Sequence, residues 1–301
     1  MEQIVQQVLN GLTVGSGYAL VALGYTMVYG VLKFINFAHG DLFMLGTYVG
    51  LSVALVCLGG GLSNQWLVLL LVFVAAMSLV GLVGVSIERV AYRPLRRSGR
   101  LAPVVSALGC AVVLQNAVML ASGARYQVFP EGLVPSAAWR VAGMTVPLLR
   151  VSVLILSLIF MGLLYLFIHR TTVGAAIRAT ALDHDTARLM GINVDRIIML
   201  VFLIGPALGA AAGIMIGLYY RQVYFTMGWS YGLKAFTAAV LGGIGNIPGA
   251  MVGGIILGLL ETLGAAYISA AWKDAFAFLL LISILILRPT GLLGERVAEK
   301  L

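Results

Sequence analysis

Residues 66–87 read WLVLLLVFVAAMSLVGLVGVSI, an apolar stretch without a charged side chain. A helix rises about 1.5 Å per residue and the hydrocarbon core of a bilayer is about 30 Å thick, so this stretch can cross a membrane once. The whole chain has a similar composition, because 61% of its 301 residues are hydrophobic and only 10% are charged. Soluble domains are about 45–50% apolar and about 25% charged. The composition therefore excludes a soluble enzyme, a disordered chain and a nucleic-acid-binding protein, and two cysteines exclude a secreted disulfide scaffold.

Charged or turn-rich breaks divide the chain into similar segments. These lie at about 8–31, 42–61, 66–87, 103–122, 150–168, 197–218, 233–243, 250–268 and 275–288. Segment 233–243 is too short to cross a bilayer, so it forms a half-helix or joins its neighbour. The sequence predicts an all-α, polytopic helical membrane bundle of about 8–10 transmembrane helices, with broken or short helices, in which residues 1–301 form a single transmembrane domain.

The basic residues indicate how the bundle is oriented. Thirteen of the 19 Lys and Arg fall on one side of it: Lys33, Arg89, Arg93, Arg96, Arg97, Arg100, Arg170, Arg178, Arg188, Arg196, Arg288, Arg296 and Lys300. Cytoplasmic loops carry an excess of Lys and Arg, so this side, with the C-terminus, is expected to be cytoplasmic. With nine spans the N-terminus would lie outside; a re-entrant short segment or a further span would place it inside. The long loop 123–149 lies on the side opposite the basic one and is expected to be external, either as a docking surface or as a plain connector.

Glycine is frequent, with 37 residues, and often recurs at four-residue spacing. The repeats are Gly11/Gly15, Gly46/Gly50, Gly209/Gly213/Gly217, Gly245/Gly249/Gly253 and Gly254/Gly258. Small residues at this spacing share one helix face and let two membrane helices approach closely. The pattern predicts a tightly packed bundle and says nothing specific about function.

Two polar breaks interrupt the bundle, INFAHGD at 35–41 and GGIGNIPG at 242–249. Non-helical backbone at membrane depth needs protein or a water-filled cavity to satisfy its polar groups, and paired Gly/Pro breaks in the two halves of a chain mark transport pathways. The candidate pathway residues are Asn36, Phe37, His39 and Asn246, with His39 expected nearer the interface than the midplane. Two tight cytoplasmic turns are the alternative.

Glu261 lies near the middle of segment 250–268. A charge at this depth costs a few kcal/mol, so the side chain should face the bundle interior, paired or protonated. Lys234 is the candidate partner. A structural, hydrogen-bonded role is favoured over ion coupling, because a relay of further intramembrane carboxylates or histidines is missing from the sequence.

The loop 169–196 contains alanine-rich stretches that predict short helices. Asp183 and Asp185 stand where carboxylates favour a helix N-terminus, and Gly191 suits the position after a helix end. The loop is interpreted as a rigid cytoplasmic knob for another protein, or alternatively as an amphipathic linker on the bilayer.

Within this loop, the pattern Asp185-Thr-Ala-x-x-x-Gly191 resembles the Glu-Ala-Ala-x-x-x-Gly loop of ABC importer permeases, with Asp and Thr at the first two positions. Further motifs occur at 17–30 (GYALVALGYTMVYG), 35–40 (INFAHG), 88–96 (ERVAYRPLR), 190–193 (MGIN), 234–249 (KAFTAAVLGGIGNIPG) and 288–294 (RPTGLLG). Together they resemble the LivH-type permease of branched-chain amino-acid ABC importers over essentially the whole chain.

The resemblance implies a non-catalytic membrane subunit without a cofactor in the bacterial inner membrane. Its partners would be a LivM-like second permease, two cytoplasmic ABC ATPases and a periplasmic substrate-binding protein that delivers branched-chain amino acids. Asp185, Ala187, Arg188 and Gly191 would couple to the ATPase, since the sequence has no Walker A pattern of its own. Urea or short amides are alternative cargo, and a stand-alone secondary transporter or channel is the alternative from another class.

Overall fold

The computed structural model describes residues 2–96, 98–99, 101–134, 137–141 and 144–294. Arg97, Arg100, Arg296 and Lys300, on which part of the predicted charge bias rests, lie outside these residues. The helices are α1 (Glu2–Leu32), α2 (His39–Gly59), α3 (Gln65–Ile87), α4 (Leu101–Ser122), α5 (Leu148–Arg170), α6 (Thr172–Leu182), α7 (His184–Leu189), α8 (Val194–Tyr220), α9 (Met227–Gly242), α10 (Ile247–Tyr267) and α11 (Lys273–Leu287).

Eight helices within the described ranges are long and apolar enough to cross a membrane. This confirms the predicted polytopic all-α bundle. The short segment predicted at 233–243 is α9, which has 16 residues and starts earlier than expected. A π-helical turn, Glu88–Tyr92, and a 3-10 turn, Arg93–Leu95, extend α3. A further 3-10 turn, Ala270–Trp272, precedes α11.

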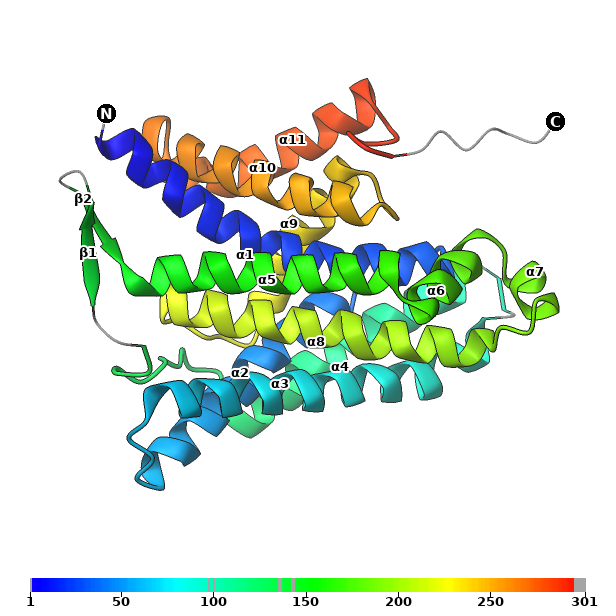
Figure 1. Cartoon of the computed structure of the whole chain (residues 1–301), viewed down its shortest axis with the longest axis horizontal. Helices are drawn as coiled ribbons and strands as arrows, with labels where there is room; N and C mark the ends of the chain where they lie inside the picture. Colours follow the sequence, from blue (N-terminus) through cyan, green and yellow to red (C-terminus); the bar gives the residue numbers. More distant parts are fainter. Residues whose placement is uncertain (1, 97, 100, 135–136, 142–143, 295–301) are drawn as a thin grey trace.

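The bundle has two distinct ends (Figure 1). The N-terminus lies at one end, together with an antiparallel hairpin of β1 (Ala138–Val141) and β2 (Met144–Pro147). In this hairpin Ala138 pairs with Pro147. We call this end of the bundle the hairpin end. Helices α6 and α7 lie at the other, which we call the α7 end. The hairpin lies within the loop 123–149, which supports a small folded element there rather than only a connector.

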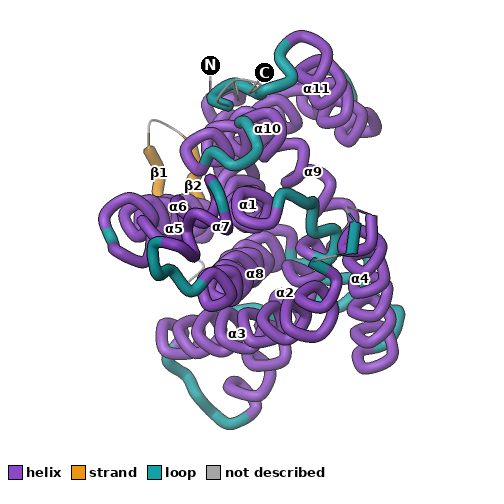
Figure 2. The backbone as a smooth tube through the Cα atoms, turned by 90° about the vertical axis from the view of Figure 1, so that its right-hand side faces the viewer, coloured by secondary structure: helices purple, strands orange, loops and turns teal. Residues whose placement is uncertain are grey.

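Helices α1 and α8 form the centre of the bundle, as the view from the α7 end shows (Figure 2). Of the most apolar stretch of each helix, 94% is buried in α1 and 72% in α8, against 17% in α4. The outer helices therefore leave apolar side chains for lipid or another subunit. The inner helices meet through small residues. A Cβ placed on Gly258 of α10 would lie 2.2 Å from Cα of Gly15 of α1, so a larger residue at this position would overlap the backbone of α1. This confirms the close helix packing predicted from the glycine spacing.

Helix α2 begins inside the bundle. Residues 33–38 fold back along α1, and His39 then lies against Gly24 of α1 and against Gly205 and Gly209, near the middle of α8. His39 is fully buried and is thus deeper in the bundle than the interfacial position expected from the sequence. The start of α9 meets this point from the other side, since Gly228 lies against Gly40 and Asp41.

Candidate translocation and coupling site

The α6–α7 segment is held rigid by a cap at each break in the helix. Oγ1 of Thr171 accepts a hydrogen bond from the Gly174 amide (2.9 Å) and caps α6. Oδ1 of Asp183 accepts one from the Thr186 amide (2.6 Å) and caps α7. Side-chain oxygens at these positions satisfy amides that have no partner within the helix. The backbone hydrogen bond from Thr186 lowers the pKa of Asp183.

The end of α7 agrees with the prediction for Gly191. This residue follows the cap residue Met190 with φ of +82°, a left-handed conformation that favours glycine. The Ile192 amide donates back to the Ala187 carbonyl (3.0 Å), and Asn193 then caps α8. The predicted N-terminal role of Asp183 is confirmed as well. The chain thus turns from α7 into α8 within a few residues.

Three of the four predicted coupling residues lie at the surface of this segment. Asp185 and Arg188 form an exposed ion pair of 3.1 Å, and Gly191 is exposed, while Ala187 is buried against the bundle. Sequence reasoning missed the apolar residues beside them. Leu182, Leu189 and Met190 are 87%, 87% and 78% exposed. The signal was present, because three large apolar side chains in a polar connector are unusual unless they contact a partner.

Hydrogen bonds tie the α6–α7 segment and its neighbours to the inner helices. The ring nitrogen Nε2 of His184 lies 2.7 Å from the Val31 carbonyl, near the end of α1. The Tyr92 hydroxyl of the π-helical turn donates to Oδ1 of Asn36 (2.7 Å). Thus both the end of α1 and the first polar break are connected to elements at the α7 end.

An ion cluster joins the 88–96 segment to the start of α8. Arg93 and Arg96 each lie 2.7 Å from a carboxylate oxygen of Asp195, and Arg96 also pairs with the buried Glu88. Multiple charge-assisted contacts hold a geometry better than one isolated surface pair does. The turn after α3 and the helix after α7 therefore form one connected surface.

The first break buries most of its polar groups. Asn36 and Asp41 are each 1% exposed, and Phe37 is half-buried. Oδ1 of Asp41 accepts a hydrogen bond from Gln115 of α4 (2.8 Å). Both ring nitrogens of His39 find no hydrogen-bond partner within the described part of the chain, and the ring packs at 4.8 Å from that of Tyr25. An unpartnered buried imidazole is costly, so this point is unusual in an otherwise apolar core.

The second break is a capped turn at the α7 end. Oδ1 of Asn246 accepts a hydrogen bond from the Gly249 amide (2.9 Å), and its Nδ2 donates to the Leu293 carbonyl (2.7 Å). The amides of Leu292 and Leu293 also donate to the end of α9. The two breaks approach each other, because Ile35 and Ile244 line the same small hollow. Asn36, Phe37, His39 and Asn246 remain predicted pathway residues.

Glu261 is paired with Lys234, as predicted. Nζ of Lys234 lies 2.8 Å from Oε1 of Glu261, and both side chains are buried. Lys273 contacts the same oxygen at 3.2 Å. Two ammonium groups therefore compensate the buried carboxylate, which fits a structural role better than an isolated proton-carrying group. Over the residues that the structure describes, there is no group of three His, Cys, Asp or Glu that could hold a metal ion.

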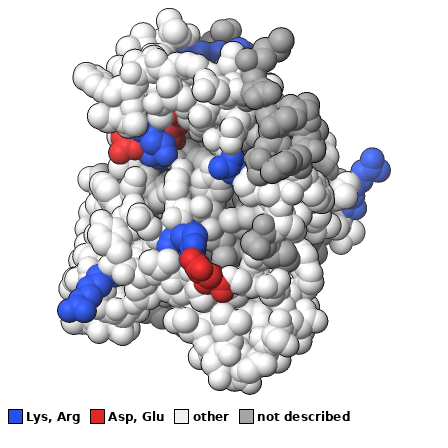
Figure 3. Space-filling model, turned by 90° about the vertical axis from the view of Figure 1, so that its left-hand side faces the viewer, with Lys and Arg blue, Asp and Glu red and all other residues white. Residues whose placement is uncertain are grey.

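The surface at the hairpin end carries few charges (Figure 3). One exposed ion pair there joins Arg221, after α8, to Glu131 of the 123–137 loop at 3.0 Å. An isolated bridge between Gln127 and Val223 connects the same two segments. These two segments are therefore joined to each other at the hairpin end.

Comparison with known proteins gives consistent matches along the chain. The family described as the permease component of branched-chain amino acid transport systems matches residues 7–285. The chain is 44% identical to the high-affinity branched-chain amino acid transport system permease protein LivH of Escherichia coli K12, covering 98% of this chain and 97% of that protein. It is also 44% identical to the permease protein BraD of Pseudomonas aeruginosa, with the same coverage.

A solved structure supports the fold alone. PsaBC from Streptococcus pneumoniae, in complex with Fab, matches with a TM-score of 0.51 at 11% sequence identity, over 93% of this chain and 91% of that one. The helical arrangement is therefore found in a protein with little sequence in common.

Proposed function

The chain belongs to the family of permease components of branched-chain amino acid transport systems, and on that premise we propose that it is a membrane subunit of an ATP-driven importer for these amino acids. With a LivM-like second permease it forms the translocation pathway. Two cytoplasmic ABC ATPases drive the cycle, and a periplasmic binding protein delivers the substrate. The protein is a multi-pass protein of the bacterial inner membrane.

The observation that carries this proposal is the shape and chemistry of the α6–α7 segment. Its caps make it rigid, and it presents Leu182, Leu189 and Met190 beside an exposed ion pair. Exposed apolar anchors on a rigid element, surrounded by charged groups, suit a protein–protein contact. This segment inserts into a cleft of the ATPase, with the Asp185–Arg188 pair at its rim.

The contacts of the segment provide a route for motion into the bundle. Displacement of α7 acts on α1 through the His184–Val31 hydrogen bond, and α1 is the most buried of the spanning helices described. Packed helices change between discrete arrangements rather than deforming continuously. The expected result is alternation between outward- and inward-facing states of the pathway.

The α7 end with the C-terminus then faces the cytoplasm, and the hairpin end faces the periplasm. The joined segments 123–134 and 221–226, with the hairpin β1–β2, are the docking surface for the binding protein. This orientation agrees with the excess of Lys and Arg at the α7 end.

Substitution of the apolar anchors tests the coupling role. Leu189→Glu should weaken co-purification of the ATPase about tenfold or more, as expected for an interface anchor. Val128→Glu is the matched control, because Val128 is also exposed but lies at the hairpin end, away from the α6–α7 segment. Equal ATPase recovery for both variants would contradict the coupling role.

Reconstitution tests the proposed class of transporter. In proteoliposomes, leucine uptake should require the second permease, the ATPase subunits, ATP and the loaded binding protein. Uptake by this chain alone would instead establish a self-contained transporter and refute the proposal.

A further inference from the structure

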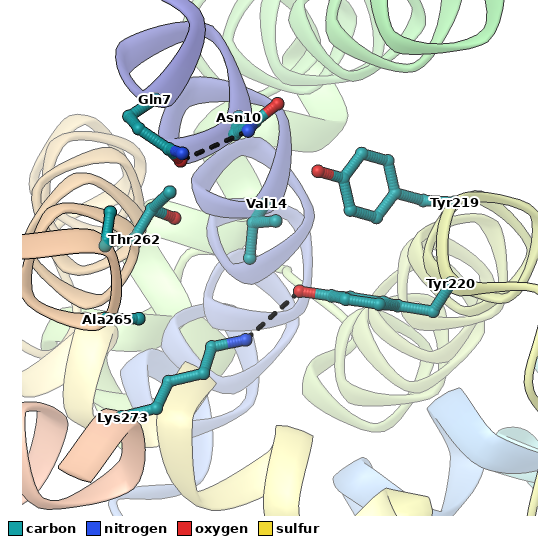
Figure 4. A pocket seen from close by; sticks show the side chains of 9 residues that line it. Gln7, Asn10, Val14, Tyr219, Tyr220, Thr262, Ala265 and Lys273 are labelled. Carbon is teal, nitrogen blue, oxygen red and sulfur yellow. Dashed lines mark hydrogen bonds between the residues drawn. The ribbon is translucent and has the colours of Figure 1, made fainter. Parts of the chain in front are cut away.

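A pocket of about 270 Å³ opens at the hairpin end between α1, α8, α10 and α11 (Figure 4). Its lining residues are Gln7, Asn10, Val14, Tyr219, Tyr220, Thr262, Ala265, Ala266 and Lys273. The volume is just below the range of about 300–1,000 Å³ that is usual for small-molecule sites, so a small ligand is expected. The lining combines an ammonium group and tyrosine hydroxyls with a few small apolar side chains.

Lys273 connects this pocket to the buried charges behind it. Its Nζ lies 3.2 Å from the Tyr220 hydroxyl and 3.2 Å from Oε1 of Glu261. Lys234 lies 2.8 Å from the same oxygen of Glu261 and 2.6 Å from Oδ1 of Asp274. Two ammonium groups and two carboxylates thus form one cluster with balanced charge.

The pocket lining has hydrogen-bonding capacity that the described residues do not use. Oδ1 of Asn10 is buried and finds no hydrogen-bond partner among them. A buried acceptor without a partner costs free energy, so a ligand that donates a hydrogen bond would be stabilised here.

Lys273 is better placed than Lys234 to exchange partners. The Lys273 side chain is 33% exposed and points across the pocket toward Tyr220, whereas Lys234 is 7% exposed and lies between two carboxylates. An arriving carboxylate can therefore reach the Lys273 ammonium without first uncovering the buried pair. The Tyr219 hydroxyl points toward α1 and Asn10, where the ligand's donor would lie.

We propose that this pocket is an outer subsite for zwitterionic α-amino acids, in which Lys273 binds the α-carboxylate and Oδ1 of Asn10 binds the α-ammonium group. Val14, Ala265 and Ala266 contact the apolar side chain. A zwitterion adds no net charge, so the balance of the cluster is kept. Urea and short amides lack a carboxylate for Lys273 and bind weakly.

This inference rests on the proposed function, since it gives the site to which the binding protein would release its substrate. It also narrows the substrate class, because the pocket distinguishes amino acids from uncharged amides. Both consequences follow from Lys273, which can be tested separately from ATPase coupling.

Transport by the full complex tests the role of Lys273. In proteoliposomes with saturating loaded binding protein, Lys273→Gln should lower leucine uptake about tenfold or more, which is the usual effect of losing a charged hydrogen bond. Lys273→Arg should retain most of the uptake. Arg288→Gln, which removes an exposed cation outside the pocket and outside the proposed docking surface, should match the wild type.

A double variant separates binding from charge balance. Lys273→Gln with Glu261→Gln leaves no newly unpaired charge, so it should recover uptake if Lys273 only neutralises Glu261. The subsite predicts that uptake stays low. Recovery to within about twofold of wild type would overturn the proposal.

Labelling gives a readout that does not depend on transport. Ala266→Cys, with Cys57 and Cys110 replaced by serine, places a thiol at the exposed edge of the pocket. In the assembled complex, leucine should slow its reaction with a maleimide, and leucinamide and urea should not. Protection without ATP-driven uptake would refute the proposed function but keep the subsite; uptake without protection would refute the subsite alone.

Discussion

The two polar breaks look alike in sequence, since each combines asparagine with glycine between apolar segments, but the structure uses them differently. The first break, 35–41, leads back into the bundle and starts α2 beside the middle of α8. The second, 242–249, contains the turn from α9 to α10 at the α7 end, and hydrogen bonds join it to Leu293. Only the first break places a helix start inside the core.

The glycines show the same difference. A Cβ on Gly40 would lie 2.2 Å from the Gly228 carbonyl oxygen, so this glycine permits a close helix approach. Gly245 has φ of +95°, and a Cβ placed on it would meet no atom within 4 Å, so this glycine permits a turn. Amino-acid composition alone does not distinguish a glycine needed for packing from one needed for a turn. Replacing each glycine with alanine and measuring the loss of stability does.

The largest expected effect is at the first break. Gly40→Ala should destabilise the protein by about 3 kcal/mol, because the added methyl group meets backbone that cannot move aside. Gly245→Ala is the matched control, with an expected cost of about 1 kcal/mol for the left-handed conformation. Thermal unfolding in detergent, followed by size-exclusion chromatography, measures both.

If Gly40→Ala lowered stability no more than Gly245→Ala does, the proposed difference between the two breaks would be wrong. It would mean that α2 and α9 can separate at this point without loss. In that case the buried helix start would not be a packed contact.

The next effect concerns the hydrogen bond that anchors the first break. Tyr92→Phe leaves Oδ1 of Asn36 buried without its donor, at an expected cost of about 2 kcal/mol in unfolding free energy. Tyr165→Phe, at an exposed position of α5, should change stability by less than about 0.5 kcal/mol. Comparable melting curves for the two variants would show that the first break is not held by this contact.

At the second break the expected effect is smaller. Asn246→Ala removes the cap of α10 and should cost about 1 kcal/mol. Asn246→Asp keeps the capping oxygen but loses the donor to the Leu293 carbonyl, so it should fall between wild type and alanine. If the aspartate variant is no better than alanine, the contact with residue 293 outweighs the cap.

The smallest effect is expected at the exposed start of α7, which lies outside both breaks. The pKa of Asp183 is lowered because its carboxylate accepts the Thr186 amide. A group with a depressed pKa in the folded state stabilises above its unfolded pKa, about 3.9, and loses that contribution as pH falls through the folded value. Acidification should therefore loosen α7 in the wild type, detected as faster proteolysis near Leu189. Asp183→Asn caps without titrating, so an identical pH profile in this variant would contradict the assignment.

Much of the fold followed from local sequence. Apolar segment lengths predicted the spanning helices, and cap residues predicted the limits of α7, because both signals act over a few residues. The Lys234–Glu261 pair was also predictable, since a buried carboxylate requires a compensating group.

The remaining features depend on contacts between residues far apart in the sequence, which a local sequence pattern cannot predict. The partners of Asn36 and Asp41 are 56 and 74 residues away in sequence, on helices brought near by packing. The depth of His39 depends on how residues 33–38 fold back. The outer pocket needs the ends of four helices, so neither Tyr219 nor Lys273 stood out in the sequence.

The π-helical turn at Glu88–Tyr92 has a further geometric consequence. Such a turn contains one residue more than the α-helix around it would, and each residue of an α-helix turns the chain by about 100°. The extra residue therefore sets the rotational phase of everything that follows it. Rewinding this turn into an α-helix would rotate Arg93 and Arg96 away from Asp195 without shifting α3 along its axis. Rotation about one helix axis is thus sufficient to break this ion cluster, while the packing of α3 against α8 at Gly81 and Gly84 remains.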